Sequence, residues 1–326
     1  MTIENVKRRV VSVDIRVDET TVAIVDVRGN IISKSSFPTG VSSNVGDYVA
    51  MLSNKIVELV EANGGYESIR SVGVCCKSSN YLTGCIENAA NLPWKGNIPL
   101  TAMLRDRLGM AVSLGNNAHA RALGEKAYGV AHGMNNFILI TLGGGMGSCI
   151  YSNGLVHLGF NGFAGEIGHT LAKAGGRQCG CGNNGCLETY TSDKGIVLTA
   201  HEVLSEIREP SPLRQVENLT PAIIATFCER GDALATEIMR RTGHILGIGL
   251  ANYASVVNPE AIIFTGRISR LGSCLLDPAY ESFNEHVFHN AEGKIKFLLS
   301  DFDDSEANLL GASVLAWTVK EYSLFR

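Results

Sequence analysis

The sequence contains no long apolar run and no extended run of basic residues. No stretch approaches the ~18 consecutive apolar residues that a membrane-spanning helix needs, and the charged N-terminus precedes no signal-peptide core. The 28 basic residues are nearly balanced by 32 acidic ones, which leaves a net charge of -4. This balance carries no electrostatic signature of nucleic-acid or anionic-membrane binding. These absences predict a cytoplasmic protein with a small or neutral partner, without membrane or direct nucleic-acid contact.

Proline is scarce, with 8 residues against 36 glycines in a chain of 326. The glycines stand mostly between short apolar runs, which predicts many strand-to-loop transitions and a mixed α/β protein. A hydrophobic fraction of 45% with 18% charged residues excludes a disordered chain and a miniprotein held by disulfides alone. The length corresponds to about two ordinary domains.

Cysteine is present in an odd number, 9, and three of these residues lie between positions 179 and 186. In a long chain this crowding favours a metal site over disulfides. His169 and the thiols of Cys179, Cys181 and Cys186 supply four donors, a closed tetrahedral set that predicts a structural zinc ion. Glycines among the ligands allow the tight backbone that such a site requires. The alternative is a group of small buried thiols in a glycine-rich loop.

Both halves of the chain show the same order of β-rich and helical segments. In the first half three β-rich runs predict an antiparallel meander, and apolar residues at helical spacing follow them. The predicted strands there are 10–16, 20–27, 31–37, 71–76 and 111–114, and the predicted helices are 45–62, 99–107 and a segment from about 118. In the second half, strands are predicted at 137–142, 148–152, 155–158 and 261–264, and helices at 198–208, 221–229, 233–257 and 305–322.

The repeated order predicts a two-domain α/β protein in which βββαβα units are duplicated. The predicted domains are a small N-terminal α/β domain, residues 1–118, and a large domain, residues 119–304. The C-terminal helix, residues 305–326, is predicted to return to the first domain.

A run rich in glycine, residues 143–147, lies between two predicted strands. Glycine permits positive φ and close backbone approach, so the N–H groups of Gly143, Gly144, Gly145 and Gly147 can face a phosphate. A dinucleotide-binding loop would instead open a helix, whereas a strand is predicted to follow here. The alternative is a plain glycine hairpin.

Two adjacent motifs carry a family resemblance that runs nearly the whole length of the chain. Ala164-Gly165-Glu166-Ile167-Gly168-His169 is followed, after nine further residues, by Cys179-Gly180-Cys181-Gly182-Asn183-Asn184-Gly185-Cys186-Leu187-Glu188. This pattern resembles the A-G-E-I-G-H and C-x-C-G-x-x-G-C-x-E signatures of the ROK family of repressors, open reading frames and sugar kinases. Supporting matches lie at 91–94, 142–147, 258–260 and 310–312. The resemblance implies the two-domain actin-like ATPase fold, which is ribonuclease H-like.

The resemblance also implies a bound sugar, ATP with Mg²⁺, and a homodimer or homotetramer. The sugar, a hexose or N-acylhexosamine in a cleft between the domains, would be held by Asn91, Asn116, Asn117, Glu166, His169 and Glu188. ATP and Mg²⁺ would be held by Asp14, Gly143, Gly144, Gly145, Gly147 and Gly266. Carboxylates suit the sugar side because each is a strong acceptor that can take two hydroxyl donors.

The sequence departs from the family pattern mainly on the nucleotide side. Asn117 stands where the family's E-N-D-A-N-A motif has its catalytic aspartate, and an amide cannot accept the hydroxyl proton during phosphoryl transfer. The family motif D-x-G-G-T reads Asp14-Ile15-Arg16-Val17-Asp18, so bulky residues replace the glycines that admit phosphate. Gly144 replaces a threonine. Arg267, in the adenosine-side loop, would either block nucleotide or hold a phosphate.

These features predict a ROK sugar-kinase-like protein that phosphorylates the 6-hydroxyl of its sugar from ATP with impaired catalysis. The alternative is a catalytically silent sugar-binding or regulatory protein that keeps the sugar side and the zinc. A DNA-binding repressor would need a winged-helix segment, which the first ten residues cannot contain. A transcriptional regulator of this kind is therefore expected to lack a DNA-binding domain.

Overall fold

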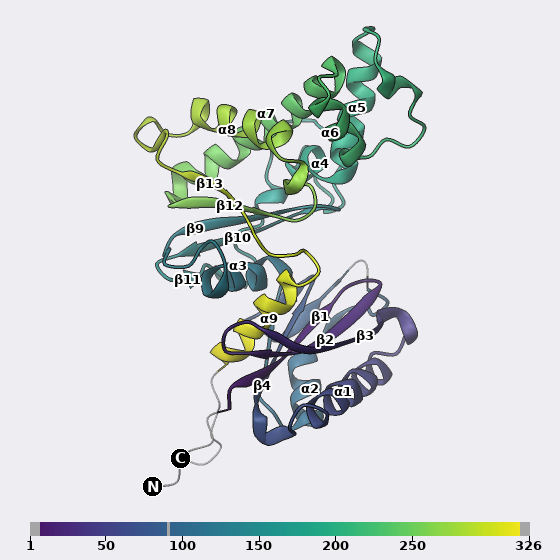
Figure 1. Ribbon diagram of the computed structural model, residues 1–326, viewed down its shortest axis with the longest axis vertical. Helices are drawn as coiled ribbons and strands as arrows, with labels where there is room; N and C mark the ends of the chain where they lie inside the picture. The colour runs from purple at the N-terminus through teal and green to yellow at the C-terminus, as the bar shows by residue number, and fades with distance from the viewer. Residues whose placement is uncertain (1–6, 90–91, 320–326) are drawn as a thin grey trace. The chain divides into compact units, whose positions relative to one another are not determined.

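The computed structural model describes residues 7–89 and 92–319, which form two compact units (Figure 1). Unit 1 takes the chain up to residue 132, residues 158–163 and the chain from residue 302 onward; unit 2 takes residues 133–157 and 164–301. The domain division at residue 118 stays a prediction. The chain first passes from unit 1 to unit 2 after residue 132, because helix α3 (Asn117–Tyr128) packs on α9 (Ala307–Thr318) within unit 1.

Unit 1 is built on a five-stranded sheet in the order β3-β2-β1-β4-β8. The first three strands pair antiparallel, which confirms the predicted meander, and β1, β4 and β8 run parallel. The strands are β1 (Arg9–Ile15), β2 (Glu19–Asp26), β3 (Ile31–Pro38), β4 (Ile69–Cys76) and β8 (Val112–Gly115). A separate small sheet contains β5 (Ser79–Asn80), β6 (Cys85–Glu87) and β7 (Asn97–Ile98).

Helices cover both faces of this sheet because successive residues of a strand point to opposite sides. Val11, Val13 and Ile15 of β1 belong to the apolar core formed with α1 (Val45–Glu61) and α2 (Leu100–Leu108). Val10, on the other face of β1, packs with Leu309 of α9. Helix α9 lies against β1 and β4, so an element near the end of the chain closes the sheet with which the chain begins.

Unit 2 repeats this sheet, with the order β11-β10-β9-β12-β13. Its first three strands are antiparallel neighbours, and β9, β12 and β13 run parallel. The strands are β9 (Phe137–Leu142), β10 (Met146–Ser152), β11 (Leu155–Val156), β12 (Ala261–Thr265) and β13 (Lys296–Leu299). The helices are α4 (Glu188–Thr191), α5 (Asp193–Glu206), α6 (Pro221–Glu229), α7 (Ala233–Val257) and α8 (Ser273–His286). The matching order confirms the predicted duplication of the α/β unit.

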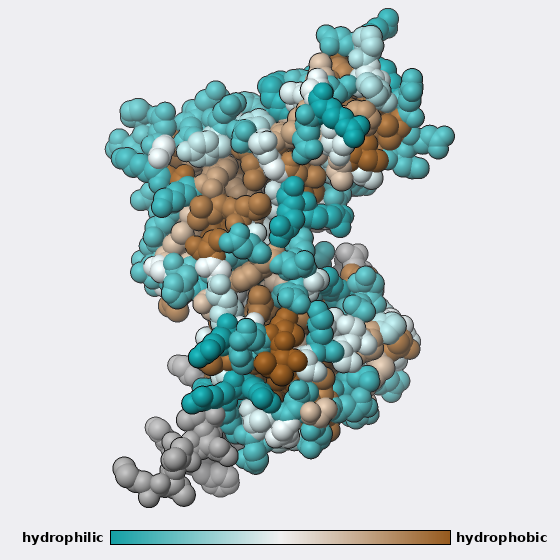
Figure 2. Space-filling model, in the orientation of Figure 1, coloured by the Kyte–Doolittle hydropathy of each residue, from teal (hydrophilic) through white to brown (hydrophobic). Residues whose placement is uncertain are grey.

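The sequence analysis missed three elements of unit 2: the short helix α4, helix α8 and strand β13. Pro278 lies inside α8 and interrupts its helical pattern, since proline normally ends a helix. Strand β13 is a half-buried edge strand, and Figure 2 shows apolar residues gathered over β12 and β13. Helix α5 begins five residues before the predicted start because the Ser192 side chain accepts a hydrogen bond from the Gly195 N–H and caps it.

Two glycines of α7 allow α8 to approach it closely in the core of unit 2. A Cβ on Gly243 of α7 would lie 2.8 Å from the Leu275 carbonyl oxygen, and one on Gly247 would lie 2.4 Å from that of Ala279. Helix α8 therefore packs on α7 at a separation that no larger side chain permits at these positions. In the part of the chain that is described, none of the helices is both long and apolar enough to cross a membrane.

Candidate metal centre and adjoining sites

The four predicted metal ligands converge in unit 2. All four donor atoms lie within 4.8 Å of one another. The His169 Nδ1 and Cys179 Sγ atoms are 3.6 Å apart, and the Sγ atoms of Cys181 and Cys186 are 3.7 Å apart. A tetrahedral ion with metal–sulfur bonds of about 2.3 Å and a metal–nitrogen bond of about 2.0 Å places its ligand atoms about 3.5–3.8 Å apart. The donor set therefore fits a tetrahedral zinc-type site, and all nine cysteines are free thiols.

The backbone of the cysteine loop is held in shape by a glycine and by short β-bridges. Gly185 has a φ of +80°, and a Cβ there would lie 1.8 Å from the Lys173 carbonyl oxygen. Bridges join Leu171 to Cys186 and Gln178 to Asn184. The backbone conformation of the loop thus brings its three thiols close together.

Arg177 anchors this loop to the helices behind it, and sequence reasoning did not single it out. One guanidinium nitrogen of Arg177 donates to the carbonyl oxygens of Thr189 and Gly195, at 2.9 Å each. The guanidinium also pairs with Glu202 at 2.7 Å and lies 4.5 Å from the ring centroid of Tyr190. Its position two residues before Cys179 was the only signal available in the sequence.

The thiols of the site differ in acidity because their surroundings differ. A hydrogen bond from the Asn183 backbone N–H lowers the pKa of Cys181. Burial raises the pKa of Cys186 to about 12, and burial also raises that of Cys179. A divalent cation at this point would hold all three as thiolates, which couples metal binding to proton release.

Glu188 connects the metal ligands to the glycine loop. One carboxylate oxygen accepts the Met146 N–H at 2.8 Å, and the other lies 3.9 Å from the Cys179 Sγ. Glu166 is exposed as a residue, but loss of solvent around its carboxyl raises its pKa; nearby His169 opposes the rise and Glu188 adds to it. The structure thus brings Glu166, His169 and Glu188 into one electrostatic neighbourhood. Their sugar contacts stay a prediction.

The glycine loop forms the hairpin turn between β9 and β10. A Cβ on Gly143 would meet no atom within 4 Å, and one on Gly144 would meet only an Asp193 carboxylate oxygen at 3.9 Å. A ligand can therefore approach the backbone closely at both positions. A Cβ on Gly145, by contrast, would lie 2.6 Å from Glu188 Oε2. Gly147 lies in β10 itself, paired with Thr141.

The loop that contains Gly266 and Arg267, predicted to lie on the adenosine side, is more crowded than the glycine loop. Gly266 has a φ of +92°, and a Cβ there would lie 2.3 Å from the Leu142 carbonyl oxygen. The next residue, Arg267, pairs through its guanidinium with both carboxylate oxygens of Asp193. The Asp193 N–H in turn donates to the Gly143 carbonyl oxygen at 2.9 Å. Arg267 is thus linked to the glycine loop through Asp193.

Asn116 and Asn117 begin helix α3 in unit 1. The Asn116 side chain caps the helix, because its Oδ1 accepts the His119 N–H at 2.8 Å. The Asn117 Oδ1 is buried and has no hydrogen-bond partner among the described residues. An unpartnered buried acceptor is costly unless a ligand supplies a donor. Asn91 lies outside the described residues.

Asp14 is buried in unit 1, with 1% of its surface exposed, and its carboxylate is already bound on several sides. It accepts from Arg16 Nε at 2.6 Å, from Asn308 Nδ2 at 3.1 and 3.2 Å, and from the Cys75 thiol at 3.3 Å. Arg16 also donates to the carbonyl oxygens of Asp304 and Ser305, at 3.2 and 3.3 Å.

Arg121 of α3 extends this network, which the sequence analysis did not predict. It donates to Asn308 Oδ1 at 2.7 Å and to Asp304 Oδ1 at 2.8 Å. Hydrogen bonds therefore connect β1, α3 and α9 around the Asp14 carboxylate. No local pattern announces these partners, because Asn308 lies 294 residues from Asp14.

Comparison with known proteins decides the family. The family model described as "ROK family" matches residues 10–319. This chain belongs to the ROK family. It is 31% identical over 321 residues to a glucokinase of Halalkalibacterium halodurans, covering 95% of this chain and 94% of that one.

Solved structures of both branches of the family resemble this ROK protein. A ROK transcriptional regulator, described as a homologue of the Escherichia coli MLC protein, superposes with a TM-score of 0.84 at 26% identity, covering 95% of this chain and 78% of that one. A ROK glucokinase from Streptomyces griseus, solved with glucose and AMPPNP, superposes with a TM-score of 0.73 at 26% identity, covering 95% and 99%. These likenesses confirm the actin-like fold and leave both kinase and regulator open.

The residues of this ROK protein fit the two expected ligands unequally. The four donors in unit 2 fit zinc in number, type and spacing. Asp14 does not fit Mg²⁺ equally well, because the Arg16 guanidinium already supplies the cation at its carboxylate. A divalent ion would have to displace Arg16 to bind there.

Proposed function

We propose that this ROK protein binds a hexose or N-acylhexosamine and phosphorylates its 6-hydroxyl from ATP only slowly. The observation that carries the proposal is Asn117, at the position of the family's catalytic aspartate: its buried amide oxygen has no hydrogen-bond partner among the described residues. Its oxygen can accept a hydrogen bond from a sugar hydroxyl. It cannot take the proton, and loss of a general base typically costs about 100-fold to 10,000-fold in rate.

The sugar side is argued from unit 2, where its acids lie beside the metal ligands. Glu188 accepts one hydrogen bond from the Met146 N–H, so both of its carboxylate oxygens can still accept from sugar hydroxyls. A zinc ion held by His169 and the three cysteines would fix the loop that carries Glu188. Such support preorganises a binding site, because the acids keep their positions without a ligand.

The second candidate is a sugar-binding regulator without catalysis. It is favoured by two arginine–aspartate pairs: Arg16 with Asp14, in the family's first phosphate motif, and Arg267, in the predicted adenosine-side loop, with Asp193. Each ion pair would have to break before its arginine could bind a phosphate or its aspartate could bind Mg²⁺. The likeness to a ROK transcriptional regulator supports the same candidate.

Calorimetric titration of the purified chain with a panel of hexoses and N-acylhexosamines, with and without a non-hydrolysable ATP analogue, tests the proposal. Sugar binding together with turnover far below the roughly 1–100 per second of ordinary kinases is expected. Sugar heat without any nucleotide heat would favour the regulator. Turnover within the ordinary range would refute impaired catalysis, and no binding of any sugar would refute both candidates.

A further inference from the structure

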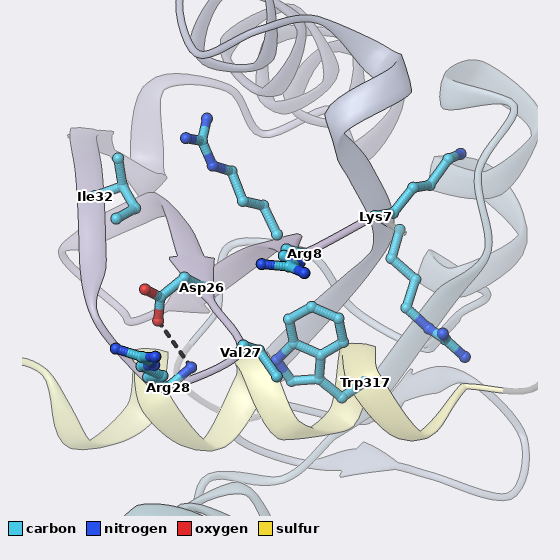
Figure 3. A pocket seen from close by; sticks show the side chains of 9 residues that line it. Lys7, Arg8, Asp26, Val27, Arg28, Ile32 and Trp317 are labelled. Atoms are coloured by element: carbon cyan, nitrogen blue, oxygen red, sulfur yellow. Dashed lines mark hydrogen bonds between the residues drawn. The ribbon is translucent and has the colours of Figure 1, made fainter. Parts of the chain in front are cut away.

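A basic pocket lies in unit 1, formed by segments that are far apart in the sequence. Its volume is about 620 Å³. It is lined by the chain before and at the start of β1, the end of β2 with the turn after it, the start of β3, the start of β4 and the end of α9 (Figure 3). The lining residues are Lys7, Arg8, Arg9, Asp26, Val27, Arg28, Ile32, Arg70 and Trp317.

The charge of the basic pocket is unusual for this chain. Five cations and one carboxylate give its lining a formal charge of +4, in a protein whose net charge is -4. In the described part of the chain, none of the Lys7, Arg8, Arg28 and Arg70 side chains forms an ion pair. Like charges gathered without counter-charges repel one another, and an anion that binds among them relieves this repulsion.

The single acid of the basic pocket offsets only one of its five positive charges. Both Asp26 carboxylate oxygens are used by the turn that follows β2: they accept from the Arg28 N–H, the Asn30 N–H and the Asn30 side-chain amide, at 2.8 to 2.9 Å. Figure 3 shows the first of these bonds. Asp26 therefore holds the turn that presents the Arg28 side chain, and among the described residues it forms no ion pair with Arg8, Arg28 or Arg70, whereas the Arg9 guanidinium donates to the Asn63 carbonyl oxygen at 2.7 Å.

The remaining wall of the basic pocket is apolar and partly flat. Trp317 extends from α9 into the lining, and Val27 and Ile32 are 58% and 45% exposed (Figure 3). An indole presents a face on which a planar ring such as a nucleic-acid base can stack. The pocket volume lies within the roughly 300–1,000 Å³ of small-molecule sites. Cations beside an aromatic wall suit a ligand with several negative charges and one planar ring.

We propose that the basic pocket is a binding site for a nucleoside polyphosphate, with the phosphates among Arg8, Arg28 and Arg70 and the base against Trp317. The site is separate from the family's nucleotide position. It contains none of the glycine-loop residues, and Asp14 lies toward the other end of β1, about 16 Å from Arg9 at the usual rise of a strand. It would therefore serve as an effector site, whatever the activity at Asn117.

Tryptophan fluorescence tests the proposal on the full-length protein, because the chain has only two tryptophans and Trp94 is 4% exposed. The probes are ADP, adenosine and inorganic tripolyphosphate, titrated in Mg²⁺-free buffer. ADP is expected to quench Trp317 and to bind at least about tenfold more tightly than adenosine, because its phosphates accept charge-assisted hydrogen bonds that adenosine cannot form. Tripolyphosphate is expected to bind without the quenching that a stacked ring causes.

The variant Arg28→Ala/Arg70→Ala is expected to weaken ADP binding by about tenfold or more, because two guanidinium partners are lost. Both residues are exposed, so the fold should survive, and a thermal melt checks it. The control Arg105→Ala removes an exposed charge from α2 and should leave the affinity within about twofold. Trp317→Phe should abolish the quenching.

Three results would overturn the proposal: no binding of ADP at millimolar concentration, equal affinity in the double variant and the wild type, or equal affinity for adenosine and ADP. If tripolyphosphate binds tightly and the adenosine ring of ADP adds no affinity, the site binds anions only and the proposed contact between the base and Trp317 is refuted. Sugar binding measured by calorimetry should be the same in the double variant and the wild type. Failure of this proposal is thereby distinguished from failure of the proposed sugar function.

Discussion

At the scale of single residues, Asn117 is the position at which the predicted loss of catalysis is tested most directly. Asparagine and aspartate are nearly isosteric, so Asn117→Asp restores an ionisable group without rebuilding the pocket. We expect phosphorylation of a bound hexose to rise by about tenfold or more, short of the full 100-fold to 10,000-fold value of a general base. Recovery is partial because Arg16 still pairs with Asp14 and Gly144 still lacks a hydroxyl. A coupled assay of sugar-phosphate formation measures it.

The matched control for this experiment is Asn218→Asp, which makes the same chemical change at an exposed position. It should leave turnover unchanged. If Asn117→Asp gains nothing while ATP binding is demonstrably intact, the position is not that of the base, and the alignment of Asn116 and Asn117 with the family motif is wrong.

Glu166 tests the sugar side at the same scale. Glu166→Gln keeps the shape of the side chain but removes its charge, so its hydroxyl donors lose charge-assisted hydrogen bonds worth about 1.5–3 kcal/mol. We expect the dissociation constant of the preferred hexose to rise by about tenfold or more. Calorimetry measures it, with the exposed Glu281→Gln as control. Unchanged affinity for every tested hexose would remove Glu166 from the sugar site.

At the scale of elements, we predict that the cysteine loop depends on a bound metal ion. Cys181→Ser replaces a soft thiolate with a hydroxyl that zinc binds poorly, so zinc content should fall from one ion per chain to well below one. The free energy of unfolding should fall by roughly 2 kcal/mol or more, since metal binding is part of folding. Elemental analysis and thermal melting measure the two effects. Cys85→Ser, outside the loop, should change neither.

Full metal content and unchanged stability in Cys181→Ser would show that the four residues are only buried thiols and an imidazole in a glycine-rich loop. Low zinc in the wild type would have the same meaning, provided that the protein was purified without chelators.

The network around Asp14 joins three elements, and Arg16 is its cation. Arg16→Gly leaves a buried carboxylate without its ion pair, at a cost of about 1–2 kcal/mol once screening of a guanidinium that is 41% exposed is allowed for. The vacated carboxylate should then take Mg²⁺. We expect millimolar Mg²⁺ to raise the melting temperature of Arg16→Gly more than that of the wild type, with NaCl of equal ionic strength as control. Equal responses would show that Arg16 does not occupy a cation site.

At the scale of the whole molecule, the end of the chain stabilises its beginning. Leu315 of α9 is 1% exposed and packs with Cys75 of β4 and Ala120 of α3. Leu315→Ala should cost about 2–5 kcal/mol of the free energy of unfolding, as for other buried leucines. Val256→Ala on α7, a site 84% exposed, should change it by less than about 0.5 kcal/mol. Urea denaturation measures both, and equal small effects would mean that α9 contributes little to the stability of unit 1.

The sequence by itself determined the features that depend on local spacing. The four metal ligands fall within 18 residues of chain, and hydrophobic periodicity predicted most strands and helices because each element obeys its own repeat. The repeated order of elements was enough to predict the duplication. It was not enough for α8 and β13, where a proline and an exposed edge weaken the local pattern.

The tertiary structure alone decided which distant residues meet. Arg16 reads in the sequence as a bulky substitution, and only the fold shows it bound to Asp14 beside Asn308. The basic pocket was not evident from a nearly balanced composition, because Arg28, Arg70 and Trp317 join the adjacent Lys7, Arg8 and Arg9 only in the folded chain. Charges far apart in sequence influence one another only when folding brings them within a Debye length of about 8 Å. Spacing along the chain does not specify the distance between these side chains. That distance is set by the pairing of β1 with β2 and β4 and by the packing of β1 against α9.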